Sequence, residues 1–149
     1  MKTPKMVVSK TFEFDFSHFL PGYNGKCKNL HGHRGICMIA VEDYINTQTG
    51  MVIDFVEMKR IIDKEIMDIM DHNHLNNIIE MPTAENICLW IWNKLIKAGL
   101  NNLSYVKFWE TPSSCCALTK ESMNEYMNQL IYKGNNISSS YDIEEEDDE

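Results

Sequence analysis

The chain has 149 residues, of which 44% are hydrophobic and 24% are charged, and this composition is typical of one globular domain. Its formal charge is −8, but seven acidic residues lie between Asp142 and Glu149, so the remainder carries only −1. We therefore predict a single domain over residues 1–133 and an acidic, disordered tail over residues 134–149. A nearly neutral body argues against nucleic acid as a partner.

The cysteines indicate a reducing compartment. They are odd in number and contain no C-x-x-C pair: Cys27, Cys37, Cys88, Cys115 and Cys116. The first ten residues, MKTPKMVVSK, lack the apolar run of a signal peptide, and no stretch reaches the length of a membrane span. We expect a cytoplasmic protein with no membrane partner.

Two strands are predicted in the first third of the chain. Phenylalanines at 12, 14 and 16 alternate with acidic residues, which predicts a half-buried strand over residues 7–16 that ends near His18. A polar loop spans residues 20–29. The β-forming segment HGHRGICMIAVEDYI then predicts a second strand, closed by the turn NTQTG.

Two helices and two further strands follow. Asp54 and Glu57 resemble a helix cap with its reciprocal acid, ahead of an amphipathic helix that ends at DHNHLNN. Pro82 and Thr83 begin a second helix that runs to Gly99. The strands LSYVKFWE and SCCAL and a short extra helix over residues 120–132 complete the order β-β-α-α-β-β, which indicates an α+β domain.

Three histidines form a candidate metal site. His31 and His33 are two apart and share one face of their strand, and His18 ends the neighbouring strand. Three neutral imidazoles suit zinc and leave a fourth position for water or substrate, as in catalytic sites. If Cys27 were the fourth ligand, the zinc would instead be structural, in a binding module without catalysis.

Candidate proton-transfer groups lie nearby in the sequence. Lys26 and Lys28 flank Cys27, and their charges favour a thiolate in this loop. Asp71 could orient His72 so that the imidazole exchanges protons with a thiol. The alternative is that Asp71 begins a turn and His72 lies on the surface.

Two further residues are candidates for ligand binding. Glu110 ends an apolar strand, where its carboxylate could accept two parallel hydrogen bonds from an amino-pyrimidine edge such as that of a pterin or guanine. A solvated strand end is the alternative. Thr83 is interpreted mainly as a helix cap. A contact between its exposed backbone and a ligand is the secondary interpretation.

Six motifs in one order resemble the 6-pyruvoyltetrahydropterin synthase and 6-carboxytetrahydropterin synthase family over about residues 7–119. They are FDFSH, CKNLHGH, TGMVIDFVEMK, MDHNHLN, PTAEN and WETPSS. The resemblance implies the tunnelling fold, in which an antiparallel sheet with two helices on one face assembles into a barrel. Homo-oligomers of this fold are commonly trimers stacked into hexamers.

The resemblance also implies the site. Zn²⁺ would bind His18, His31 and His33, and the thiolate of Cys27 would abstract protons, with Asp71 and His72 as its relay. Thr83 and Glu110 would bind the pterin substrate. Zinc would make the hydroxyls and adjacent C–H bonds of the substrate side chain more acidic.

Within the family, the spacing C-x3-H-G-H of this chain resembles carboxy-forming bacterial enzymes of queuosine biosynthesis, whereas C-x5-H-G-H resembles pyruvoyl-forming animal enzymes. The resemblance therefore implies a lyase that converts 7,8-dihydroneopterin triphosphate to a carboxy-pterin, with release of triphosphate and acetaldehyde. Pyruvoyltetrahydropterin synthesis from the same substrate is the alternative. Phe16 replaces a usually small residue, and Gly35 replaces one that is often bulkier.

Overall fold

The computed structural model describes the backbone of residues 2–139 and the side-chain burial of residues 2–133. The chain divides into two units, residues 1–118 and residues 119–149, which are described separately. The prediction of one domain over residues 1–133 stays a prediction.

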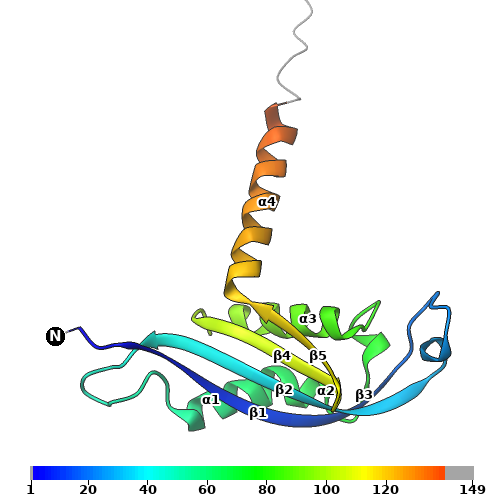
Figure 1. Cartoon of the computed structure of the whole chain (residues 1–149), viewed down its shortest axis with the longest axis horizontal. Helices are drawn as coiled ribbons and strands as arrows, with labels where there is room; N and C mark the ends of the chain where they lie inside the picture. The colour runs from blue at the N-terminus through cyan, green and yellow to red at the C-terminus, as the bar shows by residue number, and fades with distance from the viewer. Residues whose placement is uncertain (1, 140–149) are drawn as a thin grey trace, which may run out of the picture. The chain divides into compact units, whose positions relative to one another are not determined.

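The first unit is built on a five-stranded sheet with the strand order β3-β1-β2-β4-β5 (Figure 1). β1 and β2 are antiparallel along their whole length, and β2 and β4 are also antiparallel. β3 is short and pairs in parallel only with the end of β1. The strand bounds are β1 Lys5–His18, β2 His31–Tyr44, β3 Asn73–His74, β4 Leu103–Thr111 and β5 Ser114–Thr119.

The helices of the first unit cover one face of this sheet (Figure 1). The first helical segment consists of α1 (Phe55–Ile62), a π-helical turn (Asp63–Met67) and α2 (Asp68–Met70), and the second is α3 (Ala84–Lys97). The structure confirms the predicted α+β class and the two helical segments on one face. Barrel assembly is a property of several copies and stays a prediction.

Side-chain caps fix where both helical segments begin. The Asp54 carboxylate accepts a hydrogen bond from the backbone N–H of Val56 at 2.8 Å. Thr83 Oγ1 accepts one from the N–H of Asn86 at 3.3 Å. Glu57 does not complete the predicted capping box, because its carboxylate pairs instead with Arg60.

The core lies between the helices and the sheet face that carries the even-numbered residues of β1. Helix and strand side chains of both layers are almost fully buried there: Phe14, Phe16, Cys37, Ile39, Met58, Ile62, Ile66, Met70, Ile87, Ile91, Leu95, Leu103, Val106 and Phe108. Because burial of an apolar side chain contributes about 1.5–3 kcal/mol, this layer holds the strand register that the site depends on.

Gly35 and Phe16 compensate for each other in this core. Register pairs Phe14 with Gly35 and Phe16 with His33. A Cβ atom at Gly35 would lie 2.6 Å from Phe108 Cε2 and 3.0 Å from Phe16 Cε1, so a larger residue cannot fit without displacing a ring. The small residue therefore accommodates the large one, and the two departures noted in the sequence are one packing arrangement.

The second unit contains α4 (Lys120–Ser139). This helix continues past residue 132, its predicted end, and so enters the segment predicted to be a disordered tail. Residues 140–149, the rest of that expected tail, lie outside the described residues. Among the described helices, none combines the length and the apolar character needed to cross a membrane.

Candidate metal centre

The pairing of β1 with β2 brings the three histidines together. His18 lies opposite His31, and Phe16 lies opposite His33. Residues directly opposite each other in an antiparallel pair point to the same face, so all three imidazoles share the face that the helices cover. The predicted convergence of His18, His31 and His33 is therefore present, with His18 buried and the other two partly exposed.

Hydrogen bonds to backbone carbonyls orient two of the rings. His18 Nδ1 lies 2.8 Å from the carbonyl oxygen of Pro82, and His31 Nδ1 lies 2.7 Å from that of Asn29. A carbonyl only accepts, so each Nδ1 carries the proton and each neutral ring has its lone pair on Nε2. The two Nε2 atoms face each other at 3.0 Å. Two lone pairs at this distance repel each other unless a proton or a metal ion lies between them, and carbonyls orient metal-binding histidines in this way.

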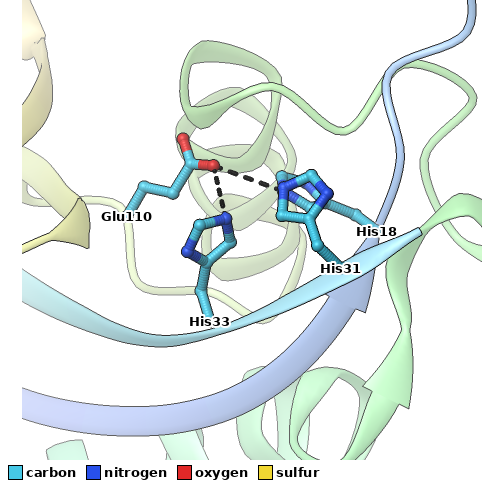
Figure 2. A group of neighbouring side chains, drawn as sticks. All are labelled: His18, His31, His33 and Glu110. Carbon is cyan, nitrogen blue, oxygen red and sulfur yellow. Dashed lines mark hydrogen bonds and ion pairs between the residues drawn. The ribbon is translucent and has the colours of Figure 1, made fainter. Parts of the chain in front are cut away.

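Glu110 joins this group from β4. Its Oε1 atom lies 2.9 Å from His33 Nε2 and 3.3 Å from His18 Nε2, and the side chain points into the cluster (Figure 2). His33 Nε2 is buried, and no hydrogen-bond partner in the described residues aligns with it, because Glu110 is close but not in line. Burial lowers the pKa of His33, so its ring is neutral at pH 7, the form that binds metals.

The residues present fit a zinc ion. His18, His31, His33 and Glu110 each offer one ligand atom, and these atoms all lie within 4.8 Å of one another. Ligand atoms about 2.0–2.1 Å from a tetrahedral zinc lie about 3.3 Å apart, close to the three short distances in the cluster. Three nitrogens and one carboxylate oxygen are a donor set that zinc accepts.

Cys27 lies outside this group of four. It is half-buried in a 3₁₀ turn, Lys26–Lys28, within the loop that joins β1 and β2. Its backbone carbonyl accepts a hydrogen bond from the N–H of Leu20 at 2.8 Å, which fixes the turn against the end of β1. The roles of Cys27 as a base or as a fourth ligand stay predictions, and the fourth side chain found beside the histidines is Glu110.

Asp71 and His72 lie at the outer edge of β1, beside Asp15. Asp71 Oδ1 accepts a hydrogen bond from the N–H of Asp15 and lies 3.0 Å from His72 Nδ1. His72 has a positive φ of 55°, uncommon for a non-glycine residue, and its N–H donates to the Asp15 carbonyl at 2.7 Å. Asp71 and His72 form a turn, and the His72 side chain is 77% exposed, as in the alternative of a surface turn; the relay stays a prediction.

This pair faces away from the histidine cluster. Asp71 and His72 border a pocket of about 230 Å³ with Glu13, Asp15 and Arg34. Asp15 lies opposite Arg34 in the register, on the sheet face opposite the histidines. Among the described residues, no hydrogen bond or ion pair joins Asp71 or His72 to Cys27.

A second pocket, of about 250 Å³, adjoins the metal cluster. His18 and Glu110 line one side, and Thr83 and Glu85 at the start of α3 line another, with Cys115 and Cys116 of β5 beyond. Thr83 thus combines its cap role with a place on the wall of this pocket. Because the pocket shares two residues with the cluster, a ligand bound there would reach the metal.

Sequence reasoning assigned Glu110 to the substrate and missed its place among the histidines. Strand alternation could have placed it there, because Glu110 follows Phe108 by two residues on β4 and so points to the same face of the sheet. Phe108 is buried, and its partner in β2 is Cys37. That alternation predicts the helix-covered face, which His33 shares. The β2 to β4 register, however, is a long-range pairing that the local pattern does not specify.

The structure thus defines a candidate mononuclear metal centre on an α+β fold, and comparisons place it in a family. The sequence profile described as 6-pyruvoyl tetrahydropterin synthase matches residues 7–121. The chain belongs to this family.

Individual relatives agree with this assignment. A 6-carboxy-5,6,7,8-tetrahydropterin synthase of Synechocystis is 40% identical over 114 residues, which cover 72% of this chain and 88% of that protein. One of Haemophilus influenzae is 33% identical over 134 residues, covering 73% and 95%. The solved structure of a Caenorhabditis elegans 6-pyruvoyl tetrahydropterin synthase has a TM-score of 0.73 at 22% identity, covering 80% of this chain and 98% of that one, so the fold is shared.

Proposed function

We propose that the chain is a zinc-dependent 6-carboxy-5,6,7,8-tetrahydropterin synthase. It would convert 7,8-dihydroneopterin triphosphate to the carboxy-pterin with release of triphosphate and acetaldehyde, and would serve queuosine biosynthesis. The observation that carries the proposal is the group of three histidines and Glu110 beside a pocket of about 250 Å³. The names of the two curated relatives and the three-residue gap between Cys27 and His31 support the carboxy-forming reaction.

His18, His31 and His33 would hold the zinc ion. When bound, zinc supplies Lewis-acid chemistry that acidifies the hydroxyls of the substrate side chain. The carbonyls of Pro82 and Asn29 keep two of the rings in the metal-binding tautomer.

Cys27 would take protons from the substrate side chain. The thiolate is the reactive form of a cysteine, and Lys26 and Lys28 lie on either side of Cys27. Its 3₁₀ turn is held to the end of β1 through Leu20, which lines the pocket beside the metal cluster. The reaction breaks one carbon–carbon and one carbon–oxygen bond, so the enzyme is a lyase, and one water is consumed for the carboxylate.

Asp71 and His72 would relay these protons between copies of the chain. Asp71 holds the Nδ1 side of His72, which leaves Nε2 to exchange a proton. Because the pair faces away from its own histidine cluster, we propose that it serves Cys27 of a neighbouring copy. Among the described residues, β3 covers the outer edge of β1 only at Phe16 and Ser17. The rest of this strand edge can therefore pair with another copy of the chain, which supports assembly.

The experiment is product analysis. Zinc-loaded protein is incubated with 7,8-dihydroneopterin triphosphate, and the pterin product is identified by mass spectrometry, with chelator-treated protein as the control. We expect 6-carboxytetrahydropterin only from the loaded protein. A pyruvoyl product would show that the chain catalyses the alternative synthase reaction. If zinc-loaded protein converts no substrate, the chain would instead be a zinc-binding module without catalysis.

A further inference from the structure

Two different roles are assigned to the Glu110 carboxylate in this site. In the proposed function its carboxylate binds the amino-pyrimidine edge of the pterin. In the structure, Glu110 Oε1 lies 2.9 Å from His33 Nε2 and 3.3 Å from His18 Nε2. Binding an amino-pyrimidine edge through two parallel hydrogen bonds needs both carboxylate oxygens. When Oε1 is bound to a metal, one lone pair and part of the negative charge of that oxygen are engaged by the cation, so Oε1 is a poorer acceptor for the ring and the two roles compete.

We infer that Glu110 is the fourth metal ligand of the substrate-free protein, and that the pterin edge competes with the metal for this carboxylate. The pterin part of this inference rests on the proposed function, whereas the ligand part does not. It differs from the sequence prediction, in which Glu110 only anchors the substrate and the fourth position stays open.

Three features of the cluster support the ligand role. The two Glu110 contacts match the spacing of about 3.3 Å expected between ligands of a tetrahedral zinc site. His33 Nε2 is buried with no aligned hydrogen-bond donor or acceptor in the described structure, as expected when its lone pair points at an ion and not at Glu110. A carboxylate beside three neutral imidazoles also offsets part of the charge of a divalent cation.

The exchange would couple the metal to the pterin. Zinc with three histidines and a carboxylate has a closed, four-coordinate site, like structural zinc sites. Removal of Glu110 by the pterin edge opens the fourth position only when a substrate is present to fill it. By linkage, a metal that holds Glu110 must weaken pterin binding, and pterin must weaken metal binding by the same factor.

The ligand role is tested without substrate. Zinc affinity and the visible spectrum of the Co²⁺-substituted protein are measured for the wild type, Glu110→Gln and Glu110→His. Glu85→Gln is the matched control, because Glu85 lines the same pocket but lies outside the group of four. We expect Glu110→Gln to lose more than about tenfold in zinc affinity and to shift the Co²⁺ bands, since even outer-shell changes cost this much. Glu85→Gln should do neither.

The Glu110→His variant separates the two roles. It also shows whether a loss of zinc in Glu110→Gln comes from the lost ligand or from misfolding. An imidazole can replace the carboxylate on the metal, so this variant should regain zinc affinity while pterin binding stays lost. Identical zinc affinity and Co²⁺ spectra in the wild type and Glu110→Gln would overturn the ligand role. That result would leave the proposed synthase reaction standing, because product analysis does not depend on it.

The exchange is tested with unsubstituted pterin, which lacks the side-chain hydroxyls. Its dissociation constant is measured by fluorescence for zinc-loaded and zinc-free wild-type protein. We expect zinc to weaken pterin binding several-fold. Equal or tighter binding in the zinc-loaded protein would overturn the exchange.

Discussion

His18 and His31 face each other with their Nε2 atoms 3.0 Å apart, and the Nδ1 atom of each ring is hydrogen-bonded to a backbone carbonyl. These carbonyls belong to Pro82, ahead of α3, and to Asn29, ahead of β2. The chain thus holds both imidazoles in one tautomer and one orientation before any ion binds. Such preorganisation reduces the conformational entropy that metal binding must overcome.

The first prediction concerns metal content. His31→Ala should lose most bound zinc, because it removes one of three nitrogen ligands, whereas Cys27→Ala should keep a full equivalent. Elemental analysis of the purified proteins measures both. Equal loss of zinc in the two variants would instead support Cys27 as a ligand in a structural site.

The histidine cluster was predictable because a strand has a period of two residues. His31 and His33 must share a face, and His18 ends the neighbouring strand of the same hairpin. The strands, both helices and the capping roles of Asp54 and Thr83 likewise follow from local pattern. Local pattern does not determine contacts between distant segments. Glu110 joined the cluster through the β2 to β4 register, and β3 is too short to show a pattern of its own.

The placement of Asp71 and His72 shows the same limit more strongly. Their residue types suggested a relay, but only the fold shows that they lie beside Asp15 on the edge of β1 and face away from the cluster. His72, which has a positive φ, also donates its N–H to the carbonyl of Asp15, a partner distant in sequence.

A second prediction follows from the role proposed for Cys27. Cys27→Ala should lower kcat by about 100-fold or more, the range for removing a general base, while the pterin dissociation constant changes little. Cys116→Ala is the matched control, since this half-buried cysteine lines the pocket wall. Near-normal turnover by Cys27→Ala, measured in single-turnover assays, would remove Cys27 from the mechanism.

Mixing of two inactive variants tests whether the relay works between copies. Cys27→Ala and His72→Ala should each be inactive. In an equal random mixture, about one interface in four pairs an intact Cys27 with an intact His72 of the neighbouring copy, so co-refolded mixtures should recover up to about a quarter of wild-type activity. Mixtures of Cys27→Ala with Cys27→Ser provide the control and should recover nothing. If the first mixture also stays inactive although mixed oligomers form, the relay acts within one chain.

Packing around Gly35 gives a prediction about stability. Gly35→Ala should lower the free energy of unfolding by about 1–3 kcal/mol, because its Cβ would lie 2.6 Å from Phe108 Cε2. Phe16→Leu in the same chain should recover part of this loss, since the Phe16 ring is also in the way. Thermal unfolding of the two single variants and the double variant measures the coupling. Additive losses would show that Gly35 and Phe16 do not compensate for each other.

The most direct test of the proposed reaction is its carbon balance. Cleavage to the carboxy-pterin keeps one side-chain carbon and releases the other two as acetaldehyde, whereas pyruvoyl formation keeps all three. Trapped acetaldehyde and free triphosphate are therefore measured together during turnover by the zinc-loaded protein. The proposal predicts one acetaldehyde for each triphosphate released, and triphosphate released without acetaldehyde would contradict it.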